Sequence, residues 1–304
     1  MKTDFHLLAE RLDDESEKMP FHTGWYLKNI RTGEIAVRNG DVIVPSASTR
    51  KIAILMAALK SVNENTLTLN QEVLIEKRYQ ANDSGCFQHL KPGFRITFED
   101  ALTMMIIVSD NTCTGAVSDI VGLDTVNSFS RSIGMKGTNH LIGLPPLGLG
   151  RSHSLAQVNT TTPEDVGLLL NLILEGASND SSAKKLGATP TLCNLALDIL
   201  SWQKLKTKLP AKLPLGTKIA HKTGTGYESR NVNDAGIIFK DGSPLFILSV
   251  FTENVSRAHR VSAIIDSGVI WINTWLLRNL RIAFGGMKYS GVGREGGFKS
   301  LQFF

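Results

Sequence analysis

The chain has 304 residues, 42% of them hydrophobic, so it can bury a substantial core as one large domain or as two interleaved layers. The net charge of +5 is moderate and the basic residues are scattered, which disfavours nucleic-acid binding and is compatible with an anionic substrate. No segment reaches the length of a membrane span, so no membrane partner is expected. The cysteines are three (Cys86, Cys113 and Cys193), an odd number that provides no disulfide framework and suits a reducing compartment.

The first 15 residues predict an amphipathic helix that carries acidic groups and has no apolar stretch of signal-peptide length. The sequence as written therefore favours a cytoplasmic location, or a periplasmic one if a leader has been removed. Residues 24–29 and 34–38 then predict a β-hairpin around Ile30-Arg31-Thr32-Gly33.

A helix is predicted to begin at Ser48, after Pro45 and before the apolar run 52–59. Ser48 and Lys51 are three residues apart, so they would lie on the same helix face. A serine hydroxyl becomes a good nucleophile when a base takes its proton, and a lysine in a partly dry, positively charged cleft can be that base. Backbone N–H groups at a helix start would favour negative charge developing beside the serine.

From about residue 66 to 210 the pattern is mainly helical, with glycine and proline breaks, and residues 217–252 return to strand character. Strands near both ends of the chain predict one sheet built from both terminal regions. The helical middle would form a second lobe, with a cleft between the two.

Two further motifs accompany Ser48 and Lys51. Ser109-Asp110-Asn111 follows the apolar run 101–108, and Lys222-Thr223-Gly224 follows residues 217–220. The order S-x-x-K, S-D-N and K-T-G is the motif set of class A β-lactamases and penicillin-binding proteins. Over about residues 20–253, the chain resembles this family of serine hydrolases.

The resemblance implies an α/β (α+β) fold of the β-lactamase/transpeptidase type, with two lobes: an antiparallel sheet flanked by helices, and an all-helical lobe. The hydrolase domain would cover residues 1–256. Its sheet lobe would be drawn from about 20–65 and 211–275, and its helical lobe from about 66–210.

The resemblance also implies roles for residues. Ser48 would be the acylated nucleophile and Lys51 its base, while Ser109 would relay a proton to the leaving nitrogen under the electrostatic influence of Lys222. The backbone N–H groups of Ser48 and Thr225 would form the oxyanion hole. The substrate-binding residues would be Asn111, Thr223, Gly224, Thr225 and Arg230. No metal or cofactor is expected, and the partner would be a small molecule that bears a carboxylate.

The loop before Thr160-Thr161-Thr162-Pro163 departs from the class A pattern. Class A enzymes activate the deacylating water with a glutamate on this loop, yet residues 139–159 contain neither Glu nor Asp. Glu164 is predicted to lie in the first turn of the next helix instead. A β-lactam adduct should therefore deacylate slowly, unless His153, His140 or Lys51 activates the water.

Residues 257–304 resemble the C-terminal end of an aldehyde dehydrogenase. The segments that carry this resemblance are Ser267-Gly268-Val269-Ile270-Trp271 and Phe284-Gly285-Gly286-Met287-Lys288. The chain has no room for the cofactor domain and catalytic cysteine of that family. Our hypothesis is a gene fusion in which residues 256–266 supply the terminal helix of the hydrolase. The glycine-rich remainder would be a loose extension or a surface for self-association.

The sequence thus predicts a serine hydrolase that forms an acyl-enzyme at Ser48 and hydrolyses β-lactams, an activity that confers antibiotic resistance, or related amides. Two alternatives on the same scaffold remain open. One is a cytoplasmic amidase, esterase or peptidase; the other is a penicillin-binding protein or sensor that deacylates slowly.

Overall fold

A computed structural model describes residues 3–80, 84–145, 149, 153–226 and 231–253. The description below concerns the unit formed by residues 1–253. The predicted terminal helix at 256–266 and the domain boundary at 256 lie outside the described residues. The helices are α1 (Asp4–Glu17), α2 (Lys51–Asn63), α3 (Phe98–Ile107), α4 (Asn111–Val121), α5 (Leu123–Ser132), α6 (Pro163–Gly176), α7 (Asp180–Lys185) and α8 (Pro190–Ser201).

The main sheet has five antiparallel strands in the order β2-β1-β9-β8-β7. The strands of this sheet and of the two smaller sheets are, in chain order, β1 (Thr23–Asn29), β2 (Ile35–Arg38), β3 (Val44–Pro45), β4 (Glu72–Leu74), β5 (Arg95–Thr97), β6 (Thr160–Thr161), β7 (Ile219–Thr225), β8 (Asn231–Lys240) and β9 (Ser243–Glu253). The predicted hairpin is confirmed as β1 and β2. Because β1 also pairs with β9, the prediction that both terminal regions build one sheet is confirmed.

The two faces of the sheet bury different helices. Trp25 and Leu27 pack with Phe5 of α1, whereas Tyr26 joins the main core on the side of α6. Successive strand residues point to opposite faces, so this alternation places α1 and α6 on opposite sides of β1. Gly167 lets α6 approach closely, because a Cβ there would lie 2.3 Å from Cδ1 of Tyr26.

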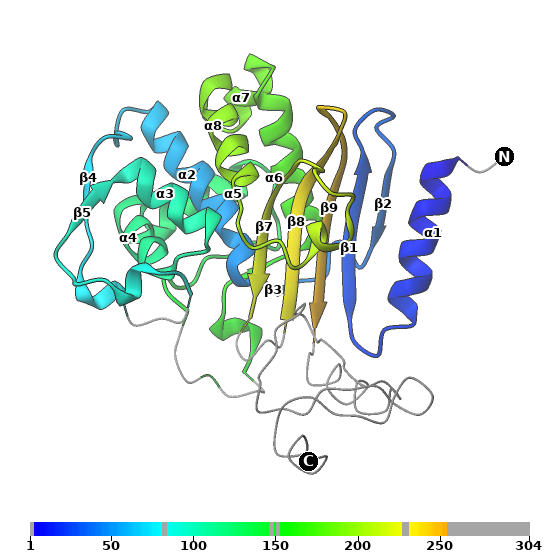
Figure 1. The fold of residues 1–304 in the computed structure, drawn as a ribbon, viewed down its shortest axis with the longest axis horizontal. Helices are drawn as coiled ribbons and strands as arrows, with labels where there is room; N and C mark the ends of the chain where they lie inside the picture. The colour runs from blue at the N-terminus through cyan, green and yellow to red at the C-terminus, as the bar shows by residue number, and fades with distance from the viewer. Residues whose placement is uncertain (1–2, 81–83, 146–148, 150–152, 227–230, 254–304) are drawn as a thin grey trace, which may run out of the picture. The chain divides into compact units, whose positions relative to one another are not determined.

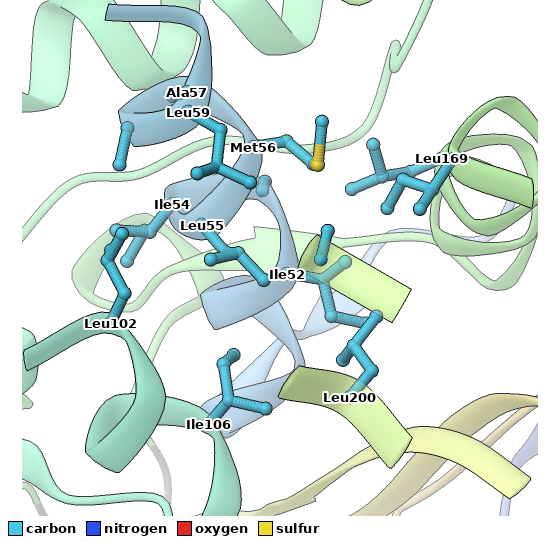
Figure 2. Packing of buried hydrophobic residues seen from close by; sticks show 14 of the residues in the cluster. Ile52, Ile54, Leu55, Met56, Ala57, Leu59, Leu102, Ile106, Leu169 and Leu200 are labelled. Carbon is cyan, nitrogen blue, oxygen red and sulfur yellow. The ribbon is translucent and has the colours of Figure 1, made fainter. Parts of the chain in front are cut away.

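Helix α2 lies at the centre of the core, and Figure 2 shows its apolar side chains surrounded by neighbouring helices. Leu102 and Ile106 of α3, Leu169 of α6 and Leu200 of α8 lie around it. A helix that is hydrophobic all round must be buried all round. The core thus fixes the position of the turn that immediately precedes α2.

The middle of the chain is helical as predicted, and Figure 1 shows α2 to α5 grouped beside β7, at the end of the sheet opposite α1. One detail is new, since β4 and β5 form a small two-stranded sheet within this region. Each of these strands has only three residues, too few for an alternating pattern to be recognised. Within the described residues, no helix is both long and apolar enough to cross a membrane.

Candidate active site

Ser48 lies in a single turn of 3-10 helix, Ala47–Arg50, that leads directly into α2. The α-helix itself begins at Lys51, so the prediction that it begins at Ser48 was three residues early. Ala47 has a φ of +44°, a left-handed conformation that costs a non-glycine residue roughly 1–2 kcal/mol. Strain of this kind persists where the surrounding structure enforces it, often beside functional groups.

Asparagine side chains from β8 hold this turn in place. The amide of Asn233 donates to the carbonyls of Pro45 at 3.0 Å and Ser46 at 3.2 Å. Asn231 donates to the same Pro45 carbonyl at 3.1 Å. The Ser48 turn is therefore tied to the sheet on one side and to the core helix α2 on the other.

Lys51 is 1% exposed and lies between the other motif residues. Its ammonium nitrogen is 2.8 Å from the carbonyl oxygen of Ser109, 3.1 Å from Oγ of Ser109 and 2.7 Å from Oδ1 of Asn111. Burial lowers the pKa of Lys51 well below its ordinary value, and the charges of Lys222 and Arg50 lower it further. The neutral amine is the form that can accept a proton from a serine hydroxyl.

Ser109 and Asn111 meet Lys51 because the chain turns sharply between α3 and α4. Ser109 has a φ of +57°, and Asp110 caps α4 by accepting from the N–H of Cys113 at 3.0 Å. Asp110 also accepts from the N–H groups of Cys86 and Phe87, both at 2.8 Å. The sequence motif thus contains a structural residue, Asp110, that presents its two neighbours to Lys51.

Strand β7 lies at one edge of the sheet and packs against the Ser48 turn. A Cβ at Gly224 would lie 3.1 Å from the backbone nitrogens of both Ser48 and Thr49, so glycine permits this close approach. Gly226 donates its N–H to Asn231 of β8. Because N–H directions alternate along a strand, the N–H of Thr225 points away from β8, the orientation that an oxyanion hole with Ser48 requires.

Lys222 is completely buried, and burial lowers its pKa to about 7 even though the carboxylate of Asp234 acts in the opposite direction. Its ammonium donates to the carbonyl of Thr223 at 2.8 Å. Asp234 also lies 3.0 Å from Nδ1 of His221. The motif lysine is therefore a buried cation whose charge depends on a carboxylate that no sequence motif indicated.

Lys208 is a second cation that the sequence did not reveal. It donates to Oγ1 of Thr225 at 2.9 Å, to the carbonyl of Asn233 at 3.2 Å and to the carbonyl of Gly224. Burial lowers its pKa to about 8. It lies in a lysine-rich stretch before β7, and nothing in that stretch distinguishes it from the lysines beside it.

These elements enclose a cavity of about 540 Å³. The predicted site residues that line it are Ser48, Lys51, Ser109, Asn111, Thr223 and Thr225. Among the described residues that line the cavity there is neither Asp nor Glu. Arg230, predicted to bind a carboxylate, lies outside the described residues.

The three candidate water-activating groups differ in position. Lys51 and His153 line the cavity. His140 is 2% exposed, and burial, aided by the charge of Arg50, lowers its pKa to about 3. Glu164 lies in the first turn of α6, as predicted, and lines a different cavity beside Tyr26.

Comparison with solved structures shows the same architecture. A β-lactamase from Sphaerobacter thermophilus is 29% identical, with a TM-score of 0.70 over 83% of this chain and 89% of that one. The structure of PBP-A is 27% identical, with a TM-score of 0.70 over 82% of this chain and 87% of PBP-A. A point mutant of PBP-A, 26% identical with a TM-score of 0.69 over 82% and 88%, is an acyl-enzyme complex with penicillin G. These matches confirm the predicted fold class.

Two family models match the chain. The Aldehyde dehydrogenase family matches residues 247–304, and 2-hydroxymuconic semialdehyde dehydrogenase from Pseudomonas putida is 59% identical over 56 residues. Those residues are 18% of this chain and only 12% of the length of that dehydrogenase. The predicted resemblance of the tail is thus confirmed. The other model covers residues 7–268, and on this match the chain is a member of the Beta-lactamase enzyme family, a serine β-lactamase-like hydrolase.

Proposed function

We propose that the protein is an acylating serine hydrolase in which Ser48 forms an acyl-enzyme with β-lactams or related amides that carry a carboxylate. The observation that carries this proposal is the position of Lys51. Its amine is buried, and burial favours the neutral form. The amine is hydrogen-bonded to Ser109 and Asn111, and Lys51 lines the same cavity as Ser48. An amine in this state is suited to serve as general base for a serine.

The proposed reaction begins when Lys51 takes the hydroxyl proton of Ser48 as Oγ attacks the substrate carbonyl carbon. The N–H groups of Ser48 and Thr225 stabilise the resulting oxyanion, each donor contributing roughly 3 kcal/mol to the transition state. Oγ of Ser109 lies 3.1 Å from Nζ of Lys51 and passes the proton from Lys51 to the leaving nitrogen. The C–N bond breaks and the acyl-enzyme remains. Water then cleaves the acyl ester and regenerates Ser48.

The substrate carboxylate would bind at the β7 side of the cavity. Thr223 and Thr225 line the cavity there, and Lys222 and Lys208 provide positive charge nearby. Because Lys208 donates to Oγ1 of Thr225, the threonine hydroxyl proton is free to point at the carboxylate. Binding of the anion would raise the pKa of both lysines and so favour their charged forms.

We also propose that deacylation of β-lactams is slow, so that the protein behaves as a penicillin-binding protein toward them. Residues 139–159 contain no Asp or Glu, and neither do the described residues that line the cavity. Within the described residues, His153 and Lys51 are the basic groups with access to a water there. An imidazole or a lysine must then do what a carboxylate does in class A enzymes.

The test is a time course of intact protein mass after mixing with benzylpenicillin or a chromogenic cephalosporin. Wild type should gain the mass of one acyl group, and Ser48→Ala should gain none. Ser178→Ala is the matched control, since it removes an exposed serine hydroxyl that does not line the cavity and should leave adduct formation intact. A wild-type protein that neither forms an adduct nor releases product would refute the β-lactam assignment, and fast release without an adduct would refute slow deacylation.

The gene-fusion hypothesis concerns the last 58 residues matched by the dehydrogenase family, residues 247–304. That match begins inside β9, a central strand of the sheet, and overlaps the hydrolase match as far as residue 268. We propose that a terminal piece of a dehydrogenase gene joined the hydrolase gene near this strand. A chain ending at residue 266 should fold and form the adduct; its failure to express in soluble form would contradict a dispensable tail.

A further inference from the structure

Arg50 is a buried cation that no motif explains. Arg50 is 4% exposed, lies between Ser48 and Lys51 in the chain, and lines the cavity of the candidate active site. Burial lowers its pKa only to about 10, so the guanidinium stays charged at neutral pH. A charge inside a protein is costly unless it is paired, which makes an arginine in this place a feature that needs a reason.

Among the described residues no carboxylate pairs with Arg50, and burial is what acts on its pKa. Its Nη2 donates to the carbonyl oxygen of Gly143, and its Nη1 has no hydrogen-bond partner among them. Nearby His140 carries no negative charge in either protonation state; its pKa of about 3 leaves it neutral, and both its ring nitrogens are unpartnered in the described structure. No opposite charge in the described part of the chain neutralises the guanidinium of Arg50.

Two consequences follow from this position. Through Gly143, Arg50 holds the segment that continues into the cavity wall at Ile142 and Pro145. Through space, its positive charge adds to the effects of burial and of Lys222 in lowering the pKa of Lys51, the next residue in the chain. We propose that Arg50 is a positioning residue: as a buried, unpaired cation in the same cavity wall, it adds to burial in disfavouring a second positive charge on Lys51, and it holds the loop at Gly143 against the cavity. This inference rests on the proposed role of Lys51 as the base.

Other charged groups also face Lys51, and their directions differ. Lys222 of β7 lowers the pKa of Lys51 in the same sense as Arg50. Asp110 at the start of α4 raises it, as does Cys113 of α4, although burial keeps that thiol protonated at neutral pH. Because the pKa of Lys222 is about 7, its contribution fades above neutral pH, whereas that of Arg50 persists. Burial remains the largest cause of the low pKa of Lys51, and of the two neighbouring cations Arg50 is the one whose effect persists above neutral pH.

The test measures the acylation rate of benzylpenicillin by quenched-flow mass spectrometry as a function of pH. If Lys51 must be neutral, the rate rises with pH through the pKa of Lys51. Removing a positive charge makes protonation easier, so Arg50→Gln and Arg50→Met should both move this limb measurably to higher pH. Each variant is first checked for a cooperative thermal unfolding transition.

Two control variants separate charge from loop anchoring. Asn127 holds the same loop by accepting from the N–H of His140 at 2.7 Å and donating to its carbonyl at 2.8 Å, so Asn127→Ala loosens the loop without changing charge. That variant should leave the pH limb in place even if the rate falls. Arg131→Gln removes one exposed charge and should also leave it in place. Arg50 variants that shift the limb no more than Arg131→Gln would overturn the proposal.

A second measurement does not depend on activity or on the folding of an Arg50 variant. Lysine labelled with ¹³C at Cε reports the protonation of each amine by NMR, and Lys51→Arg identifies the signal of Lys51. Wild type should show Lys51 titrating well below its ordinary value of 10.5, and a Lys51 that titrates at that value would overturn the proposal. A low pKa in a protein that forms no adduct would instead refute the proposed function alone.

Discussion

Replacing Gly224 with alanine should impair the chemistry at Ser48 far more than the stability of the sheet. The added Cβ would lie 3.1 Å from the backbone nitrogens of Ser48 and Thr49 and 3.2 Å from Cβ of Ala47. Gly224 does not have a positive φ, so alanine is acceptable to the backbone and the effect is one of crowding. The turn and β7 must separate by a few tenths of an ångström.

That separation acts on the two proposed oxyanion donors, which belong to the turn at Ser48 and to β7 at Thr225. Losing one such donor entirely costs about 10²- to 10³-fold in rate, so a partial misalignment should slow acylation by ~10- to 100-fold. Crowding of this kind in a packed structure typically destabilises by about 1–3 kcal/mol. The dissociation constant of the substrate before acylation should change little, because the contacts that bind the carboxylate remain.

Gly24→Ala is the matched control, since a Cβ there would also lie 3.1 Å from its neighbours, the carbonyl of Asn39 and Cγ of Pro163. Gly24 belongs to β1, which is separated from β7 by two strands. Urea unfolding should show similar losses of stability for the two variants, while quenched-flow acylation should be slow for Gly224→Ala alone. Acylation by Gly224→Ala within twofold of wild type, or equally slow acylation by Gly24→Ala, would refute the reasoning.

Three further predictions address binding, pH dependence and the core. Lys208→Met should raise KM about tenfold, or ~1.4 kcal/mol, for a substrate with a free carboxylate, and much less for the methyl ester of that substrate. The affinity of the wild-type protein for the carboxylate substrate should weaken as pH rises through about 8, where Lys208 loses its proton. The pKa of His140 is about 3 in the folded chain and 6.5 ordinarily, so between these two pH values the unfolded chain binds a proton that the folded chain does not. The free energy of unfolding should therefore fall from pH 6.5 toward pH 3, by up to ~1.4 kcal/mol per pH unit. Urea unfolding of His140→Phe at pH 7 and pH 4 should show a smaller loss; an equal loss would contradict this account. Leu55→Ala, at a completely buried position of α2, should cost about 3–5 kcal/mol of unfolding free energy, and a cost below about 1 kcal/mol would contradict the central place of α2.

The sequence alone was enough to predict the order of elements and the residues of the three motifs. The hairpin of β1 and β2 has a local turn, and the apolar run of α2 is long enough to be recognised without tertiary information. Glu164 was placed in the first turn of α6 because Pro163 and the acidic residues form a recognisable helix start. The family resemblance supplied the roles, which remain proposals. These signals depend on neighbouring residues along the chain, so they survive without the fold.

The tertiary structure decided the electrostatics of the site. Lys51 meets Ser109 and Asn111 across 58 and 60 residues of chain, and Asp234 and Lys208 reach β7 from segments that carry no motif. Whether Arg50 is a solvated surface group or a buried, uncompensated cation also depends on what packs around it. Burial and through-space charge are properties of the assembled environment, and residues far apart in the chain create that environment. The sequence could therefore name the reacting groups, whereas their protonation states and the cation beside Lys51 became visible only in the folded chain.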